Sequence, residues 1–287
     1  MLNDLLQMTE NASEHGTQID FFLEASHWFM LVLFVGWSAF FFYTLYRCWE
    51  RKHPKADYDG VKSHASSHIE LYVIIVEAVL LLGFAFPIWA KQVNEIPPEG
   101  DNLLKVHAIA YQFGWLFHYP GEDGVLGRKN PIFMKGGSPQ SEVGLDMSDP
   151  FAQDDIVSMQ VMRAPVNTPI IVDVTSRDVI HNYAVAHMRV SQDAIPGMRV
   201  PIWFTPIRTG EFEIICAQLC GAGHYSMKGI LNIQTQDEYD KWVASQAPKK
   251  PADPAPSAEP AVEPDEPEVT PENEEAAAVA ISSVTNQ

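Results

Sequence analysis

The sequence predicts a helical membrane hairpin, followed by an all-β domain and an acidic tail without regular structure. Two long apolar runs lie within the first 91 residues, short apolar or alternating runs separated by turns fill residues 103–235, and prolines recur through residues 248–275. At 287 residues the chain is long enough for one or two domains. We expect a lead-in over 1–27, the hairpin over 28–91, the β-domain over 100–247 and the tail over 248–287.

The two apolar runs are long enough to cross a bilayer. Trp28 to Tyr46 contains no charged residue, and Leu71 to Trp89 contains one acid, Glu77. A transmembrane helix needs about 20 apolar residues. A buried hairpin of a soluble protein is the alternative, but the aromatic residues at the ends of the first run, with Arg47 just beyond it, favour a membrane.

The basic residues predict the orientation of the hairpin. Five of them lie between Arg47 and His68, whereas residues 1–46 contain no Lys or Arg. By the positive-inside rule, the connecting loop faces the cytoplasm, and both termini, together with the β-domain, lie on the other side of the membrane. The first run is too long for a signal peptide and lacks a basic start and a cleavage site, so we expect a retained anchor.

The net charge of −18 limits the partners that the chain can bind. Nine acids and two lysines of this balance fall in residues 248–287, so the body of the chain is acidic as well. An acidic body argues against nucleic-acid binding, which needs a basic patch. It is compatible with a basic soluble partner that is attracted by charge.

The segment between the hairpin and the tail has the pattern of a β-sandwich or barrel. Its short runs are separated by turns, as strands of such folds are. Residues 235–247 predict a closing helix, because Tyr239, Trp242 and Val243 share one helical face. The tail cannot bury enough apolar surface to offset its ordering entropy, so we expect it to be disordered. The runs are Val157–Met162, Pro169–Thr175, His181–Met188, Arg199–Thr205, Gly210–Cys216 and Lys228–Ile233.

The strongest functional signal is a loop that carries two thiols, an imidazole and a thioether at spacings of four, four and three. These soft and borderline donors favour copper over magnesium or calcium. Two cysteines four apart on a loop can both bridge a pair of ions, and His181 upstream can supply a second imidazole. We call the segment from Cys216 to Met227 the copper loop. Its donors are Cys216, Cys220, His224 and Met227.

Two other sites remain open at this loop. A structural zinc site would use the cysteines and a histidine, but zinc prefers a closed N/S tetrahedron and has little use for Met227. A disulfide between Cys216 and Cys220 is compatible with an oxidising compartment. It would leave His181, His224 and Met227 without a function.

Residues 20–246 resemble cytochrome c oxidase subunit II. The resemblance is carried by the hairpin, the Gln112-Phe-Gly-Trp115 segment, Ser176-Arg-Asp-Val-Ile-His181, Asp193-Ala-Ile-Pro-Gly197 and the copper loop. It implies a cupredoxin-like Greek-key domain with the dinuclear copper centre CuA. Such a subunit takes electrons from a cytochrome c and passes them to haem in subunit I, where oxygen is reduced to water and protons are translocated. Subunit III is a further implied partner. The resemblance also implies an integral protein of the inner membrane whose copper domain lies on the periplasmic face.

The resemblance assigns a role to each donor of the loop. Cys216 and Cys220 would bridge the two copper ions, and His181 and His224 would each bind one ion. Met227 and the backbone carbonyl of Gln218 would be the axial donors. His187 lies six residues beyond His181, but only His181 follows the Asp-Val-Ile pattern that precedes the first ligand of the family.

Three positions depart from the family pattern. The first tryptophan of the family's Gln-Trp-Tyr-Trp motif resembles the point where the electron arrives. Here that position is Phe113, and the resemblance implies that Phe113 and Trp115 are the aromatic residues that receive the electron. Many members hold an interface magnesium with a glutamate where this chain has Gln218, so we assign no magnesium. The third departure is Glu77, which stands where the family often has proline. Glu70, seven residues earlier on the same helical face, resembles the acid at the mouth of a proton pathway into subunit I.

Other functions are compatible with parts of the chain. A quinol-oxidase homologue keeps this fold but loses the copper donors, all of which are present here. Nitrous oxide reductase has a similar copper site and needs a large second catalytic domain. A membrane-tethered copper carrier would not need acids within its spans.

Overall fold

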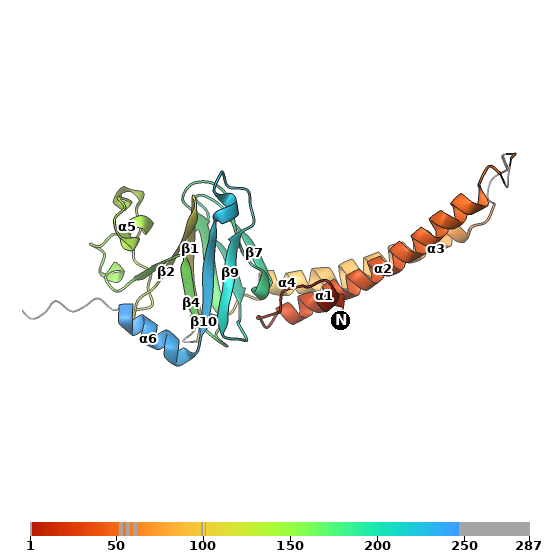
Figure 1. Ribbon diagram of the computed structural model, residues 1–287. Helices are drawn as coiled ribbons and strands as arrows, with labels where there is room; N and C mark the ends of the chain where they lie inside the picture. The colour runs from red at the N-terminus through yellow and green to blue at the C-terminus, as the bar shows by residue number, and fades with distance from the viewer. Residues whose placement is uncertain are drawn as a thin grey trace, which may run out of the picture. The chain divides into compact units, whose positions relative to one another are not determined.

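The computed structural model describes residues 2–51, 54–55, 58–59, 62–98, 100 and 102–246, so the disorder expected for residues 248–287 lies outside the described residues. Two long helical segments precede the β-domain (Figure 1). After the short α1 (Leu2–Leu5), the first segment is α2 (Gly16–Arg47). The second is α3 (Ala65–Leu80), which runs through one wider π-helical turn into α4 (Phe86–Asn94).

Both segments are long and apolar enough to span a membrane, which confirms the predicted hairpin by length and composition. The first helix begins at Gly16 rather than near residue 28. Its early turns are polar, which is why hydropathy alone places the start too late. Asp20 in these turns pairs with Arg189 of the β-domain, with Oδ1 2.7 Å from Nε. This ion pair links the first helix to the β-domain.

The β-domain is a sandwich of two five-stranded sheets, which confirms the predicted cupredoxin-like fold class. One sheet has the order β3-β2-β1-β5-β8 and the other the order β4-β10-β9-β6-β7. Most neighbours are antiparallel, but β1 pairs with β5 and β4 pairs with β10 in parallel. The strands are β1 (Leu104–Tyr111), β2 (Gly114–Tyr119), β3 (Ile156–Met159), β4 (Val161–Pro165), β5 (Ile170–Ser176), β6 (His181–Val185), β7 (Val190–Ala194), β8 (Val200–Phe204), β9 (Gly210–Cys216) and β10 (Lys228–Gln234).

Two of the expected strands differ from the prediction: one is divided between the two sheets, and the other ends early. The run Val157–Met162 is divided at Gln160, whose φ of 63° is left-handed, and its halves enter different sheets as β3 and β4. The run His181–Met188 leaves the sheet after Val185, where a 3-10 turn, Ala186–Met188, follows. An apolar run shows that a segment is buried, but it does not show where the segment changes sheet.

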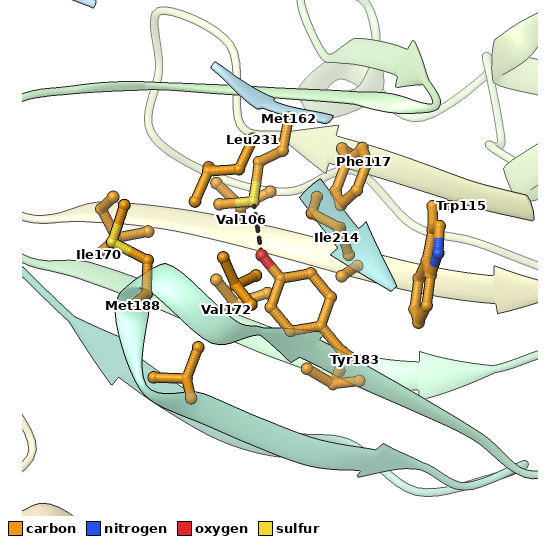
Figure 2. Close-up of a cluster of buried hydrophobic side chains, with 14 of the residues drawn as sticks. Val106, Trp115, Phe117, Met162, Ile170, Val172, Tyr183, Met188, Ile214 and Leu231 are labelled. Carbon is orange, nitrogen blue, oxygen red and sulfur yellow. Dashed lines mark hydrogen bonds between the residues drawn. The ribbon is translucent and has the colours of Figure 1, made fainter. Parts of the chain in front are cut away.

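Alternate residues of β1 and β2 face the space between the sheets. Figure 2 shows this core, in which Trp115, Phe117 and Tyr183 are fully buried. The rings of Trp115 and Tyr183 meet edge to face at 5.6 Å, and the Tyr183 hydroxyl lies 3.4 Å from the sulfur of Met162. This aromatic packing gives the strands that carry the site a rigid base.

The opposite face of the first sheet is also covered. The insertion, which we define as residues 120–155 between β2 and β3, contains α5 (Pro139–Val143). Its apolar side chains Val143, Leu145 and Ala152 form a second buried cluster with Ile109 and Leu116 of the sheet. At the end of the domain, α6 (Gln236–Gln246) packs Trp242 on Tyr119, with ring centroids 5.2 Å apart.

Candidate metal centre

The copper loop connects β9 to β10 and is closed by its own backbone. Cys216 ends β9, and its N–H donates to the carbonyl of Met227 at 3.2 Å. Gly221 has a φ of +137°, in the region that disfavours side chains. A Cβ at Gly223 would lie 2.5 Å from the ring of Phe113. Glycine is therefore needed at Gly223, because Phe113, at the tip of the hairpin formed by β1 and β2, packs directly on the loop backbone.

The sulfur and nitrogen donors of the loop face one another. The Sγ atoms of Cys216 and Cys220 are 3.8 Å apart, and both residues are free thiols. Together with His181 they form a cluster whose donor atoms all lie within 4.8 Å of one another. All three side chains are buried. The geometry therefore offers a water-poor site with two thiols at its centre.

The remaining predicted donors surround this pair of thiols. His181 Nδ1 lies 3.8 Å from Cys216 Sγ, and His224 Nδ1 lies 3.6 Å from Cys220 Sγ. The sulfur of Met227 lies 3.7 Å from Cys220 Sγ, and the carbonyl of Gln218 lies 3.1 Å from Cys216 Sγ. Each cysteine thus has one imidazole and one weaker donor beside it. This two-fold set suits a pair of copper ions better than one tetrahedral zinc ion.

The electrostatics of the thiols also fit a bound cation. Burial raises the pKa of the Cys220 thiol to about 11, and the adjacent Cys216 adds to the rise. Metals bind the thiolate form, so metal binding would release the Cys220 proton and supply the compensating positive charge.

Asp178 fixes the orientation of His181. The imidazole Nε2 lies 2.8 Å from Asp178 Oδ1, which leaves Nδ1 facing Cys216. Although partial burial opposes ionisation, hydrogen bonds from His181 and from the backbone of Gln112 and Val179 hold the pKa of Asp178 below its usual value. An ionised carboxylate behind a ligand imidazole is the usual support of a metal site. The sequence held a signal for it, since Asp178 is three residues before His181.

Gln112, at the tip of the β1–β2 hairpin, forms hydrogen bonds to this site that the sequence did not predict. Its backbone N–H donates to Asp178 Oδ2 and its side-chain Nε2 donates to the carbonyl of Cys220, each at 2.7 Å. Phe113 follows, with 37% of its surface exposed. Trp115 is fully buried beneath the loop, with its ring 6.5 Å from that of His181. Of the two aromatic residues expected to receive electrons, Phe113 alone is accessible to a soluble partner.

Three other residues of the sequence analysis lie away from the loop. Glu70 and Glu77 lie in α3 of the hairpin and are exposed in the isolated chain. His187 lies in the turn after β6, where its ring packs on Phe212 at 5.2 Å. The metal cluster contains His181 and not His187.

Comparison with known proteins identifies relatives over most of the chain. Residues 104–234 match the family model described as cytochrome C oxidase subunit II, periplasmic domain. The cytochrome c oxidase subunit 2 of Cereibacter sphaeroides is 31% identical over 247 residues, which cover 81% of this chain and 77% of that protein. The alternative cytochrome c oxidase subunit 2 of Bradyrhizobium diazoefficiens is 29% identical over 232 residues, covering 79% and 80%.

A solved structure is similar to the β-domain. The periplasmic domain of subunit II of cytochrome oxidase from Bradyrhizobium japonicum is 30% identical, with a TM-score of 0.37. The match covers 52% of this chain and 95% of that domain.

Proposed function

The chain belongs to the cytochrome c oxidase subunit II family, and we propose that it is the electron-accepting subunit of a respiratory haem–copper oxidase. The observation that carries the proposal is the convergence of the two thiols, two imidazoles, a thioether and a carbonyl at one end of the sandwich. We place this end on the periplasmic face of the inner membrane, anchored by the two candidate spans.

The proposed centre is the dinuclear copper site CuA. Cys216 and Cys220 would bridge the two ions, and His181 and His224 would each bind one. Met227 and the carbonyl of Gln218 would be the axial donors. When bound, the copper pair supplies a one-electron redox centre. Interface magnesium is not part of the proposal, because Gln218 has no carboxylate.

The surrounding protein limits movement of the ligands. His181 begins β6 and Cys216 ends β9, and these strands pair directly, with Tyr183 opposite Cys216. Asp178 holds the His181 ring, and burial keeps water from the thiols. A rigid, dry site costs little reorganisation when one electron is gained or lost.

The electron would arrive through Phe113 from a c-type cytochrome that binds the exposed face of its ring. It would then pass to haem in subunit I, where oxygen is reduced to water with proton translocation. Trp115 would support the loop from beneath, and Glu70 would lie at the mouth of a proton pathway into subunit I. Subunit III would complete the complex.

Single-turnover electron uptake by the purified oxidase complex tests this function. Phe113→Ala should slow uptake from a reduced c-type cytochrome about tenfold, which corresponds to about 1.4 kcal/mol in the barrier. Phe151→Ala is the matched control, since Phe151 is an exposed phenylalanine of the insertion. Equal uptake by the wild type and the Phe113 variant would remove Phe113 from the path.

A further inference from the structure

A cavity of about 200 Å³ lies where the ends of the two membrane helices meet the β-domain. Its walls come from α2 and the two residues before it, from α4 and from β8. Trp89 ends the second apolar run, and Lys91 and Gln92 of the lining follow it within three residues. Tryptophans gather at the level of the lipid headgroups, so the cavity lies at the membrane surface on the side of the β-domain. The lining residues are Glu14, His15, Gln18, Ile19, Ile88, Lys91, Gln92 and Trp203.

Backbone hydrogen bonds fix the walls of this headgroup-level cavity. Gln92 Nε2 donates to the carbonyl of Trp203, and Trp203 Nε1 donates to the carbonyl of Gln92, each at 2.7 Å. Just before α2, the N–H of Glu14 donates to the carbonyl of Thr205 at 3.0 Å. Both membrane helices are therefore tied to β8 or to the residue that follows it. The cavity is thus formed by the chain itself, before a ligand binds.

His15 brings unpaired polar atoms to the cavity. The residue is half-buried, and its ring packs on Trp203 with centroids 6.1 Å apart. Both ring nitrogens are buried and form no hydrogen bond within the described part of the chain. Burial lowers the pKa of His15, so at pH 7 the neutral ring offers one N–H donor and one acceptor. Because buried polar groups are nearly always hydrogen-bonded, this ring points to a polar ligand.

The exposed residues of the lining carry charges of both signs. Lys91 of α4 and Glu14 are exposed, as is the amide of Gln18. Neither Lys91 nor Glu14 forms an ion pair among the residues that the structure describes. A simple anion would meet both the Lys91 ammonium and the Glu14 carboxylate, whereas a zwitterion can pair with both. Ile19 and Ile88 add half-buried apolar surface, which suits the carbon atoms beside a headgroup.

We propose that this cavity binds the headgroup of a zwitterionic phospholipid with a primary amine, as in phosphatidylethanolamine. The phosphate accepts hydrogen bonds from the ammonium of Lys91 and the ring N–H of His15. The lipid ammonium pairs with the Glu14 carboxylate, to which a primary amine, unlike a quaternary one, can donate hydrogen bonds. The inference rests on the proposed membrane anchorage and does not involve the copper centre.

The test uses the purified oxidase complex in detergent and a phosphatidylethanolamine that carries a photoreactive group on its glycerol. Cross-links are mapped by mass spectrometry of peptides, and we expect them in residues 14–19 and 88–92. Unlabelled phosphatidylethanolamine should compete for these positions. Phosphatidylglycerol and inorganic phosphate should each compete about tenfold more weakly, because neither has an ammonium group for Glu14.

Three variants separate the parts of the headgroup. Lys91→Met should lower the cross-link yield about tenfold, and His15→Phe, which keeps a planar ring, about fivefold. Glu14→Gln should abolish the preference for phosphatidylethanolamine over phosphatidylglycerol. Lys135→Met, at an exposed lysine of the insertion, is the control with the same change of charge and should bind lipid like the wild type. Electron uptake and the copper spectrum should be unchanged in all four, which shows that each variant is folded.

Three outcomes would overturn the proposal. Equal yields for the wild type and Lys91→Met would remove the phosphate contact, and full competition by inorganic phosphate would indicate a simple anion site. A complex in which no cross-link reaches these residues would show that another subunit covers the cavity. The proposed function fails separately, if the wild-type complex lacks a dinuclear copper spectrum.

Discussion

The β-domain contains two buried histidine clusters, and their difference shows how one arrangement can serve two purposes. At the copper loop, Asp178 holds His181 by Nε2, and Nδ1 faces the thiols of Cys216 and Cys220. Under the insertion, Asp155 holds His118 by Nε2 at 2.6 Å, and Nδ1 lies 3.2 Å from Lys129 Nζ. Both imidazoles are backed by a carboxylate and present Nδ1. In the second cluster, however, the Nδ1 atom of His118 faces the amine of Lys129 rather than a thiol.

The second cluster joins the insertion to the sheet. His107 and His118 are opposite one another on β1 and β2, and Lys129 Nζ contacts Nδ1 of both. Burial lowers the pKa of Lys129 to about 7 and, together with the positive charge of Lys129, that of His107 to about 2. Neutral imidazoles around one buried lysine amine indicate a structural cluster. The thiols of the copper loop, by contrast, lie ready to take up a metal.

The largest effect should follow loss of a bridging thiol. Cys216→Ser should lower copper affinity and electron uptake by on the order of 10²-fold or more, since even changes behind a ligand cost 10–100-fold. The measurements are copper per protein and single-turnover uptake. Cys48→Ser is the control, because Cys48 is an exposed thiol at the end of the first helix. A Cys216 variant with full copper content and uptake would contradict the ligand assignment.

Near pH 10.5, where the neutral Lys129 amine is buried with little cost of deprotonation, its removal should reduce stability and leave the copper site intact. Lys129→Met leaves two buried imidazole nitrogens without this partner, at a cost of about 1–3 kcal/mol for each unsatisfied group. We expect a lower free energy of unfolding in urea and an unchanged copper spectrum. Lys135→Met, at an exposed lysine of the insertion, serves as the control. If the copper spectrum changed with Lys129, the two clusters would be coupled rather than separate.

The same lysine predicts a pH dependence. The pKa of Lys129 falls from 10.5 in the unfolded chain to about 7 in the folded domain, so between these values the unfolded state binds more protons. The stability of the domain should therefore rise as pH increases from about 7 to 10.5. Below pH 7 both states are protonated and this contribution is constant. Comparison of wild type with Lys129→Met isolates the effect, and parallel pH curves for the two proteins would exclude it.

The smallest effect should come from the contact that joins the insertion to the copper end. Arg177 pairs with Glu142 of α5 at 2.8 Å and lies 4.5 Å above the ring of Tyr111. Both charged side chains are partly exposed, so Arg177→Ala should cost no more than about 1 kcal/mol of stability. Unfolding at low and high salt would measure the screened ionic part. A loss larger than that caused by Lys129→Met would show that the insertion depends on Arg177 more than on Lys129.

The two clusters also differ in how far the sequence predicts them. The six proposed donors could be chosen from spacing and resemblance, because five of them lie within twelve residues of one loop. The membrane hairpin followed from its two long apolar runs. His107, His118 and Lys129 come together only through strand register and the path of the insertion, neither of which an apolar pattern contains. The contact of Gln112 with Cys220 spans 108 residues and left no local signal.

Electron paramagnetic resonance of the copper-loaded full chain in detergent tests most directly whether Cys216 and Cys220 bridge two copper ions. We predict hyperfine structure from one electron shared equally by two copper nuclei, at two copper ions per chain. A spectrum of isolated mononuclear copper, or a chain that binds no copper, would contradict the dinuclear assignment.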